Sequence, residues 1–228
     1  MVSPQASALK ISLFEQLIDW MEKGFFTRDA YEMLRIQYRM NEILMEFPNR
    51  EFYEGLLKAA PEVKNITLVD LVGKHKGKIL KSDDTLVRLD VKGQQILEQQ
   101  TKSLMNLQEI EVVQEVVKDL LDMGISPHDI GIITPYAAQK ARLKAVFDEI
   151  EELEINTIDG FQGREKEVIL ISWVRTQGEG FLVDERRFNV AITRPKRLLV
   201  NIGNSTNLKS INFFEKYISF ITKVGKLY

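Results

Sequence analysis

The stretch that decides the fold covers residues 155–176 and reads INTIDGFQGREKEVILISWVRT. An apolar run at 154–158 leads into a charged turn that contains Gly163, and a second apolar run follows at 167–174. Short runs rich in Ile and Val that are bounded by turns are typical of buried strands. A glycine in such a turn lets the backbone come close to a ligand. The stretch therefore predicts two buried strands joined by a turn that can approach a ligand closely. If that ligand is a phosphate, the chain should also contain a loop that holds it.

Runs of the same kind recur along the chain and alternate with helical patterns. The predicted strands lie at 34–37, 85–91, 130–134, 154–158, 167–174 and 197–203. Apolar residues recur at helical spacing over 107–121 and 143–150, and the pattern at 211–228 predicts a closing helix whose aromatic stripe belongs to the core. Strands that alternate with helices favour an α/β fold with a doubly wound, mainly parallel sheet. In such sheets, ligands bind beyond the carboxyl ends of the strands.

The composition fits a globular protein and excludes several kinds of site. The chain has 228 residues, of which 44% are hydrophobic and 28% charged, so it can form one large domain with or without an appendage. Its net charge is −2, so a nucleic-acid surface has to be a local patch or be shared with another domain or chain. The absence of cysteine and the presence of only two histidines exclude thiolate chemistry and a histidine metal site.

Neither a membrane anchor nor a secretion signal is predicted. No apolar run in the sequence reaches the roughly 18 residues that span a bilayer. The first ten residues, MVSPQASALK, lack a charged region followed by an apolar core. We therefore expect a cytoplasmic protein with no membrane partner.

One segment partly matches a phosphate-binding loop. A Walker A loop has the pattern G-x-x-x-x-G-K-[ST], in which backbone N–H groups surround the phosphates and a hydroxyl reaches Mg²⁺. In GKHKGKI, Gly73 and Gly77 are one residue too close, and Ile79 stands where the hydroxyl is needed. No acidic Walker B pair follows an apolar strand. We therefore interpret 73–84 as an exposed basic loop and expect that the chain cannot hold ATP and Mg²⁺ alone.

Four blocks of sequence together resemble one family. LRIQYRMNEILMEFPNREFYEGLLKA at 34–59 resembles motif IV of superfamily 1 helicases, and the segments 103–113 and 129–143 resemble the next conserved region. The opening stretch resembles motif V, and GFLVDERRFNVAITRPKRLLVNIGN at 180–204 resembles motif VI. Their order and spacing are similar to the branch that contains the nonsense-mediated-decay helicase and the immunoglobulin-mu-binding helicase.

The resemblance implies a RecA-like fold and a motor that consists of two such domains. In the family, the first domain carries the P-loop and the second carries motifs IV to VI, and this chain resembles the second alone. We expect a helical lead-in at 1–30, a RecA-like domain at 31–210 and a C-terminal helix at 211–228. The P-loop domain would be a partner, in a longer protein or as a separate chain, and this chain alone is expected to be inactive.

The resemblance also assigns residues to an ATP site in the cleft between the two domains. Arg39 of QYRM and Arg194 of AITRPK would reach the γ-phosphate, where negative charge builds during phosphoryl transfer. Tyr38 would stack on adenine, Gly163 would let the turn approach a phosphate, and Glu165 would accept hydrogen bonds from the ribose. The alternatives are a surface salt bridge for Arg39, a helix-terminal cation for Arg194, a core position for Tyr38, and an exposed turn with an ion pair for Gly163 and Glu165.

Two departures from the family affect this site. The residue before a proline is disfavoured in the α conformation, so Pro195 predicts that a helix at 185–193 ends at Arg194. The family more often has a small helix former in place of Pro195, so the aim of Arg194 could differ slightly. Asn41 and Glu42 replace a common His-Pro pair, which could alter local contacts with nucleic acid.

Nucleic acid would cross another surface of the domain. Thr134, Pro135 and Tyr136 follow a predicted strand, and Thr157 lies in the opening stretch. Hydroxyl and backbone N–H groups grip phosphates without reading sequence, and a tyrosine ring can stack on a base. A simple strand stop is the alternative for Thr134 and Pro135. Because this grip uses the backbone, it predicts single-stranded RNA or DNA as the partner without distinguishing between them.

Three further polar residues have more than one interpretation. Ser103 and Asn106 match the family pattern, but both are also typical caps of the helix predicted at 107–121. Arg175 ends a predicted strand and could link the nucleotide site to the nucleic-acid site.

The function that the sequence predicts is that of the C-terminal motor domain of an ATP-dependent nucleic-acid helicase. Its cofactors would be ATP and Mg²⁺, held mainly by the P-loop domain. The alternative is a non-enzymatic nucleic-acid-binding or regulatory module derived from a helicase, which would not need both arginines. A small-nucleotide enzyme is disfavoured, because the sequence has no P-loop, no G-x-G-x-x-G and no catalytic dyad.

Overall fold

The computed structural model of the chain describes residues 13–25 and 32–228. The chain divides into two compact units, with the boundary after Arg35. In the first unit, helix α2 spans Leu13–Glu22. Much of the lead-in predicted at 1–30 lies outside the described residues.

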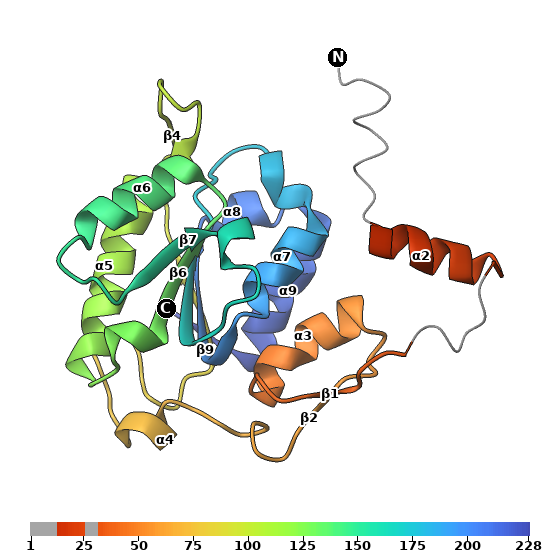
Figure 1. Ribbon diagram of the computed structural model, residues 1–228. Helices are drawn as coiled ribbons and strands as arrows, with labels where there is room; N and C mark the ends of the chain where they lie inside the picture. The colour runs from red at the N-terminus through yellow and green to blue at the C-terminus, as the bar shows by residue number, and fades with distance from the viewer. Residues whose placement is uncertain (1–12, 26–31) are drawn as a thin grey trace. The chain divides into compact units, whose positions relative to one another are not determined.

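The second unit is built on a six-stranded sheet in which every neighbouring pair of strands is parallel (Figure 1). The strand order is β10-β3-β9-β8-β6-β7. The strands are β3 (Leu86–Asp90), β6 (Ile130–Thr134), β7 (Glu154–Thr157), β8 (Lys166–Ser172), β9 (Pro195–Gly203) and β10 (Lys226–Leu227). The predicted RecA-like α/β fold with a mainly parallel sheet is confirmed.

Helices cover both faces of this sheet and create two apolar cores. The helices are α3 (Glu42–Phe52), α4 (Val69–Val72), α5 (Leu107–Asp122), α6 (Ala137–Val146), α7 (Glu185–Ile192), α8 (Ser205–Leu208) and α9 (Asn212–Val224). Helices α5 and α6 lie on one side of the sheet, and α3, α7 and α9 lie on the other (Figure 1). We call the core under α5 and α6 the first core and the core under α3, α7 and α9 the second core. In β8, Val168 and Leu170 belong to the first core, whereas Ile169 and Ile171 belong to the second. A strand buried on both faces is apolar throughout, which explains the run at 167–174.

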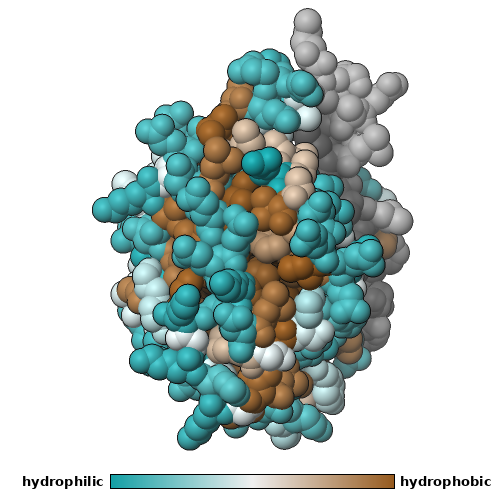
Figure 2. All heavy atoms as spheres, turned by 90° about the vertical axis from the view of Figure 1, so that its left-hand side faces the viewer, coloured by the Kyte–Doolittle hydropathy of each residue, from teal (hydrophilic) through white to brown (hydrophobic). Residues whose placement is uncertain are grey.

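Helix α5 of the first face is amphipathic, as the sequence predicts. Helix α5 buries Val113, Val116, Val117 and Leu120 and exposes Glu111 and Glu115. On the side of the molecule where Figure 1 draws α5 and α6, hydrophilic atoms flank a central band of hydrophobic atoms (Figure 2). No helix among the described residues combines the length and the apolar character that a membrane span requires.

The second core is aromatic. The Phe188 ring of α7 has its centroid 4.9 Å from those of Phe213 and Phe214 and 5.0 Å from that of Tyr217. The last three rings come from α9, so the aromatic stripe predicted in the closing helix belongs to the core. Aromatic pairs at this separation add packing energy beyond their buried area.

The closing segment 211–228 is not helical throughout, which corrects the prediction for its end. Helix α9 ends at Val224, and β10 then pairs with β3, with Lys226 opposite Val87. A Cβ atom on Gly225 would lie 2.5 Å from the Leu86 carbonyl oxygen. The glycine therefore lets the chain leave the helix and run along the edge of the sheet.

Several other elements differ from the prediction. The run at 34–37 forms only β1 (Ile36–Gln37), which pairs with β2 (Lys58–Ala59) in a separate sheet. Strands β4 (Ile96–Leu97) and β5 (Leu104–Met105) form an antiparallel pair that the sequence pattern did not predict. The helix predicted from the apolar spacing at 143–150 is α6, which begins and ends earlier. The two-residue strands β1, β4 and β5 are too short for a periodic apolar pattern to predict them.

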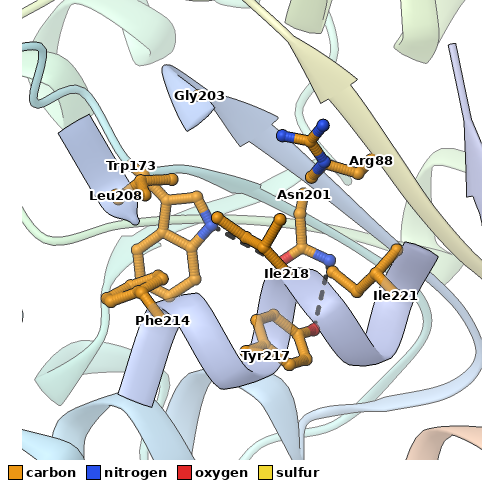
Figure 3. Close-up of a pocket in the computed structure, with 9 residues that line it drawn as sticks. All are labelled: Arg88, Trp173, Asn201, Gly203, Leu208, Phe214, Tyr217, Ile218 and Ile221. Carbon is orange, nitrogen blue, oxygen red and sulfur yellow. Dashed lines mark hydrogen bonds between the residues drawn. The ribbon is translucent and has the colours of Figure 1, made fainter. Parts of the chain in front are cut away.

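A small polar cluster interrupts the aromatic core beside β3 and β9 (Figure 3). Asn201 accepts a hydrogen bond from Trp173 Nε1 at 3.4 Å and donates one to the Tyr217 hydroxyl at 3.2 Å. Burial raises the pKa of Tyr217. Arg88 also lines this cavity, whose volume is about 10 Å³. That volume has room for about one water molecule, so the cavity is no nucleotide site.

A buried carboxylate joins α5 to the end of β8. Glu109 is fully buried, and its Oε2 accepts hydrogen bonds from Ser172 Oγ at 2.6 Å and from the Val174 N–H at 2.9 Å. Its Oε1 accepts a hydrogen bond from Asn106 Nδ2 at 3.2 Å. These bonds satisfy the backbone where Val174 adopts a φ of 70°, a conformation that is strained for a β-branched residue. Burial raises the pKa of Glu109 to about 7.

This pKa predicts how stability depends on pH. Between the ordinary glutamate pKa of 4.5 and the folded value of about 7, the folded chain binds a proton that the unfolded chain has lost. The free energy of unfolding that this proton contributes is therefore complete below pH 4.5 and decreases by about 3 kcal/mol as the pH rises to about 7. Glu109→Gln should flatten the decrease, measured by urea unfolding at several pH values.

The matched control is Glu115→Gln, which removes the same charge from the exposed side of the same helix. This variant should keep the pH dependence of the wild-type chain. An unchanged slope in Glu109→Gln would show that Glu109 is already ionised in the folded chain at pH 5.

Candidate functional site

The predicted site residues lie at two opposite edges of the sheet. Glu165 and Arg194 directly precede β8 and β9, so they lie at the amino ends of these strands. Thr134 and Thr157 end β6 and β7, so they lie at the carboxyl edge. The predicted nucleotide residues Glu165 and Arg194 therefore lie at the amino ends of the strands and not beyond the carboxyl ends, because the loops that enter β8 and β9 carry them.

Gln37 shapes the turn that carries Tyr38 and Arg39. Its Oε1 accepts hydrogen bonds from the N–H groups of Arg39 and Met40, both at 2.8 Å, and its Nε2 donates to the Met40 carbonyl at 2.8 Å. The turn leaves Tyr38 69% exposed, so the alternative of a core tyrosine is wrong. The prediction missed the role of Gln37, although this residue is part of the QYRM block.

Arg39 bridges two segments of the amino edge. Its Nε donates a hydrogen bond to Glu165 Oε2 at 2.6 Å, and its Nη1 donates one to the Thr193 carbonyl at 3.1 Å. The side chains of Arg39 and Glu165 are 34% and 42% exposed. The hydrogen bond from Arg39 holds the pKa of Glu165 below its usual value. Lys196 Nζ lies 3.5 Å from the other oxygen of this carboxylate.

Arg194 lies beside this pair at the end of α7. The helix is capped at its start by Asp184 and ends at Ile192 with Thr193 as its C-cap, close to the predicted end before Pro195. Strand β9 begins at Pro195, two residues before the predicted strand. Arg194 Nε donates to the Val190 carbonyl at 2.8 Å, so the side chain also caps the helix end. Partial burial, and then the nearby Arg39 charge, lower the pKa of Arg194. The two guanidinium groups therefore lie within electrostatic reach of each other, and neither is enclosed in an apolar core.

The turn before Glu165 requires a glycine. Gly163 has a φ of 81°, in the left-handed region that side chains other than glycine rarely adopt. No atom lies within 4 Å of the position of a Cβ, so the space above the turn is open. The next residue, Arg164, forms an ion pair with Glu154.

The loop that partly matches a phosphate loop already holds an anion. The N–H groups of Lys78, Ile79 and Leu80 donate hydrogen bonds of 2.6, 3.0 and 2.8 Å to the carboxylate of Asp119. A Cβ atom on Gly77 would lie 2.3 Å from that carboxylate. The prediction of an exposed basic loop is correct for the lysines but wrong for the backbone, because Asp119 of α5 binds it and Leu80 is buried.

The carboxyl edge is more enclosed than the sequence predicts. Thr134 is fully buried, and its Oγ1 accepts a hydrogen bond from the Tyr136 N–H at 3.4 Å. Tyr136 is only 4% exposed, because it packs with Leu104 and Val174 and accepts a hydrogen bond from Arg175 Nε at 2.7 Å. In this conformation the Tyr136 ring is not available to stack on a base, which corrects that prediction.

Two other residues of this edge are partly exposed. Pro135 precedes α6 and is partly buried. Thr157 is also partly buried, and its Oγ1 accepts a hydrogen bond at 3.3 Å from the N–H of Gly160, which lies in the 3-10 helix η3 (Asp159–Phe161). Thr157 and Pro135 are therefore the residues of the predicted nucleic-acid set that reach the surface.

The remaining polar residues position backbone. Asn106 caps α5 by accepting a hydrogen bond from the Glu109 N–H, whereas Ser103 accepts one from the Ala138 N–H in α6. Arg175 lies inside its own loop, where a Cβ atom on Gly180 would lie 2.5 Å from the guanidinium carbon. Asn41, which departs from the family, is buried and caps α3.

Comparison with known proteins identifies the family. A family described as AAA domain matches residues 9–206. The chain belongs to this family. Among curated proteins, this chain is 43% identical over 223 residues to an uncharacterized ATP-dependent helicase of Methanocaldococcus jannaschii. The match covers 95% of this chain and 32% of the relative.

Two further relatives place this chain in the branch of the nonsense-mediated-decay and immunoglobulin-mu-binding helicases, which the motifs indicated. It is 33% identical to DNA-binding protein SMUBP-2 of Mus musculus, over 97% of the chain and 22% of the relative. It is 34% identical to Regulator of nonsense transcripts 1 of Dictyostelium discoideum, over 93% of the chain and 16% of the relative. The predicted membership of superfamily 1 is confirmed, and the chain spans about a third or less of the length of these relatives.

The three N–H groups of residues 78–80 that bind the Asp119 carboxylate, here called the anion cradle, should contribute to the free energy of unfolding. Asp119→Ala should lower the free energy of unfolding of the chain by about 3 kcal/mol or more, because it leaves the N–H groups of Lys78, Ile79 and Leu80 without their acceptor. Asp122→Ala, at an exposed position one turn away, should change it by less than about 0.5 kcal/mol. Urea unfolding of both variants measures the difference, and equal effects would contradict the role of the cradle.

Proposed function

We propose that the chain is the C-terminal motor domain of an ATP-dependent nucleic-acid helicase. The observation that supports this most directly is the pair of arginines at the amino edge. Arg39 and Arg194 are both partly exposed, lie near each other and come from the segments that resemble motifs IV and VI. Two guanidinium groups at one edge suit a ligand with several negative charges.

ATP and Mg²⁺ are held mainly by a P-loop domain outside this chain. The chain's own loop with successive N–H groups is occupied by Asp119, so it cannot take a phosphate without losing that contact. Bringing the two domains together places Arg39 and Arg194 against the γ-phosphate. There they stabilise the negative charge that develops on the phosphate oxygens during transfer to water.

The residues around the arginines hold the rest of the nucleotide. Tyr38 offers an exposed ring for the adenine. The open space above Gly163 lets the turn approach a phosphate, and Glu165 accepts hydrogen bonds from the ribose hydroxyls. A carboxylate would repel the triphosphate, so the sugar is the suitable partner for Glu165.

Single-stranded nucleic acid lies along the carboxyl edge. Thr157 and Pro135 contact the phosphate backbone, and the buried Thr134 and Tyr136 fix the shape of that edge. Strand β8 joins the two edges, and its seven residues span about 23 Å. Closure of the cleft on ATP at one edge is therefore transmitted through a rigid sheet to the grip at the other.

A non-enzymatic nucleic-acid-binding module remains the competing function. The name of the SMUBP-2 relative, a DNA-binding protein, agrees with either function. A binding module has no need for two partly exposed arginines at the edge opposite its nucleic acid, so the geometry favours the motor.

The proposal predicts that Arg194→Ala, in this chain joined to its P-loop domain, lowers ATP turnover by about 10³-fold or more. Binding of single-stranded RNA or DNA should remain within about twofold, because Arg194 lies at the other edge of the sheet. Steady-state turnover and fluorescence anisotropy measure the two effects.

Arg142→Ala, at an exposed arginine of α6, is the matched control and should keep full turnover. Wild-type turnover in Arg194→Ala would reject the finger role. Failure of the joined protein to hydrolyse ATP, combined with retained strand binding, would support the binding module instead.

A further inference from the structure

The structure joins two side chains that the proposed function separates. In the free chain, Arg39 Nε donates its hydrogen to Glu165 Oε2 at 2.6 Å. With nucleotide bound, Arg39 has to point at the γ-phosphate and Glu165 at the ribose, and the α- and β-phosphates separate these two groups. The Arg39–Glu165 ion pair therefore has to open each time a nucleotide binds.

The surroundings allow the pair to open at little cost. The side chains of Arg39 and Glu165 are 34% and 42% exposed, and ion pairs exposed to this extent are weak. When Arg39 leaves, Lys196 remains 3.5 Å from Glu165 Oε1, so the carboxylate keeps a cation. When Glu165 leaves, Arg39 keeps the hydrogen bond from Nη1 to the Thr193 carbonyl. Each partner thus has a second contact that keeps it near the site.

The two arginines are held in different ways. Arg194 donates to the Val190 carbonyl at 2.8 Å and to the Arg164 carbonyl at 3.3 Å, and these partners are neutral. Arg39 is paired with a full negative charge. Arg194 is therefore already placed for an anion, whereas Arg39 is occupied until Glu165 moves.

We propose that Glu165 is a positioning residue that takes the place of the phosphate anion at Arg39 and keeps Arg39 latched until a ribose draws the carboxylate away. This inference rests on the proposed function. A polyanion without a ribose has to compete with Glu165 for Arg39. ATP carries the sugar that removes the competitor, so the latch favours a complete nucleotide over free polyphosphate.

The latch can be tested by anion binding to the 228-residue chain, without hydrolysis. Calorimetric titration with tripolyphosphate should give about threefold to fivefold tighter binding to Glu165→Gln than to the wild-type chain, the gain that follows from removing a weak ion pair. The gain should disappear when Arg39→Ala is added. In this chain joined to its P-loop domain, ATP should bind more tightly than tripolyphosphate, and this difference should become smaller in Glu165→Gln, because the amide carries no charge that has to be drawn from Arg39 to the ribose.

The matched control is Glu167→Gln, which makes the same charge change two residues away on β8, at a carboxylate paired with Lys196 and Arg197. Equal gains in Glu165→Gln and Glu167→Gln would mean a general loss of negative charge and would overturn the latch. No gain in Glu165→Gln, or a gain that survives Arg39→Ala, would overturn it as well. Unfolding midpoints of all variants verify that each one is folded.

Failure of the latch is distinguishable from failure of the proposed function. Full ATP turnover in the Arg39→Ala variant of the joined protein would remove the function that the latch serves. Loss of turnover in that variant, together with wild-type tripolyphosphate binding by Glu165→Gln, would leave the motor function standing and reject the latch alone.

Discussion

The contact between Arg39 and Glu165 connects two distant segments at the amino edge of the domain. It joins positions that are 126 residues apart, one beside the short strand β1 and one at the entry to β8. The pair is possible because β8 and β9 are neighbours in the sheet, which places Glu165 next to Arg194, Thr193 and Lys196. The fold thus brings one carboxylate among three cations, Arg39, Arg194 and Lys196, whose charges would otherwise only repel one another.

The parallel sheet explains why the domain can have two separate surfaces. Each strand enters at the amino edge and leaves at the carboxyl edge, so the loops before β8 and β9 carry Glu165 and Arg194, and the residues after β6 and β7 lie on the far side. Both faces of the sheet are covered by helices, which makes the strands between the two edges rigid. At the carboxyl edge, the buried Glu109 network ties α5 to the end of β8. The proposed motor function requires such a stiff connection between the two edges of the sheet.

The sequence predicts the parts of this structure that depend on local patterns. The buried strand at Ile130–Thr134, the cap at Asn106 and the helix end before Pro195 follow from apolar runs, side-chain chemistry and backbone restriction, and the structure has each of them. The parts it does not predict depend on contacts between distant segments. Asp119, whose carboxylate accepts a hydrogen bond from the Lys78 N–H, lies 41 positions after Lys78 in the sequence, and no local pattern predicts that contact. The burial of Tyr136 depends in the same way on Arg175, 39 positions later.

The central claim is that two guanidinium groups of this domain reach the reacting phosphate. The most direct measurement is an experimental structure of the domain joined to its P-loop partner, with ADP and a fluoride analogue of the γ-phosphate. The account predicts that Arg39 and Arg194 both donate to the analogue at about 3 Å, and that Glu165 has turned from Arg39 to the ribose. A closed complex in which either arginine points away from the analogue, with Arg39 still bonded to Glu165, would contradict it.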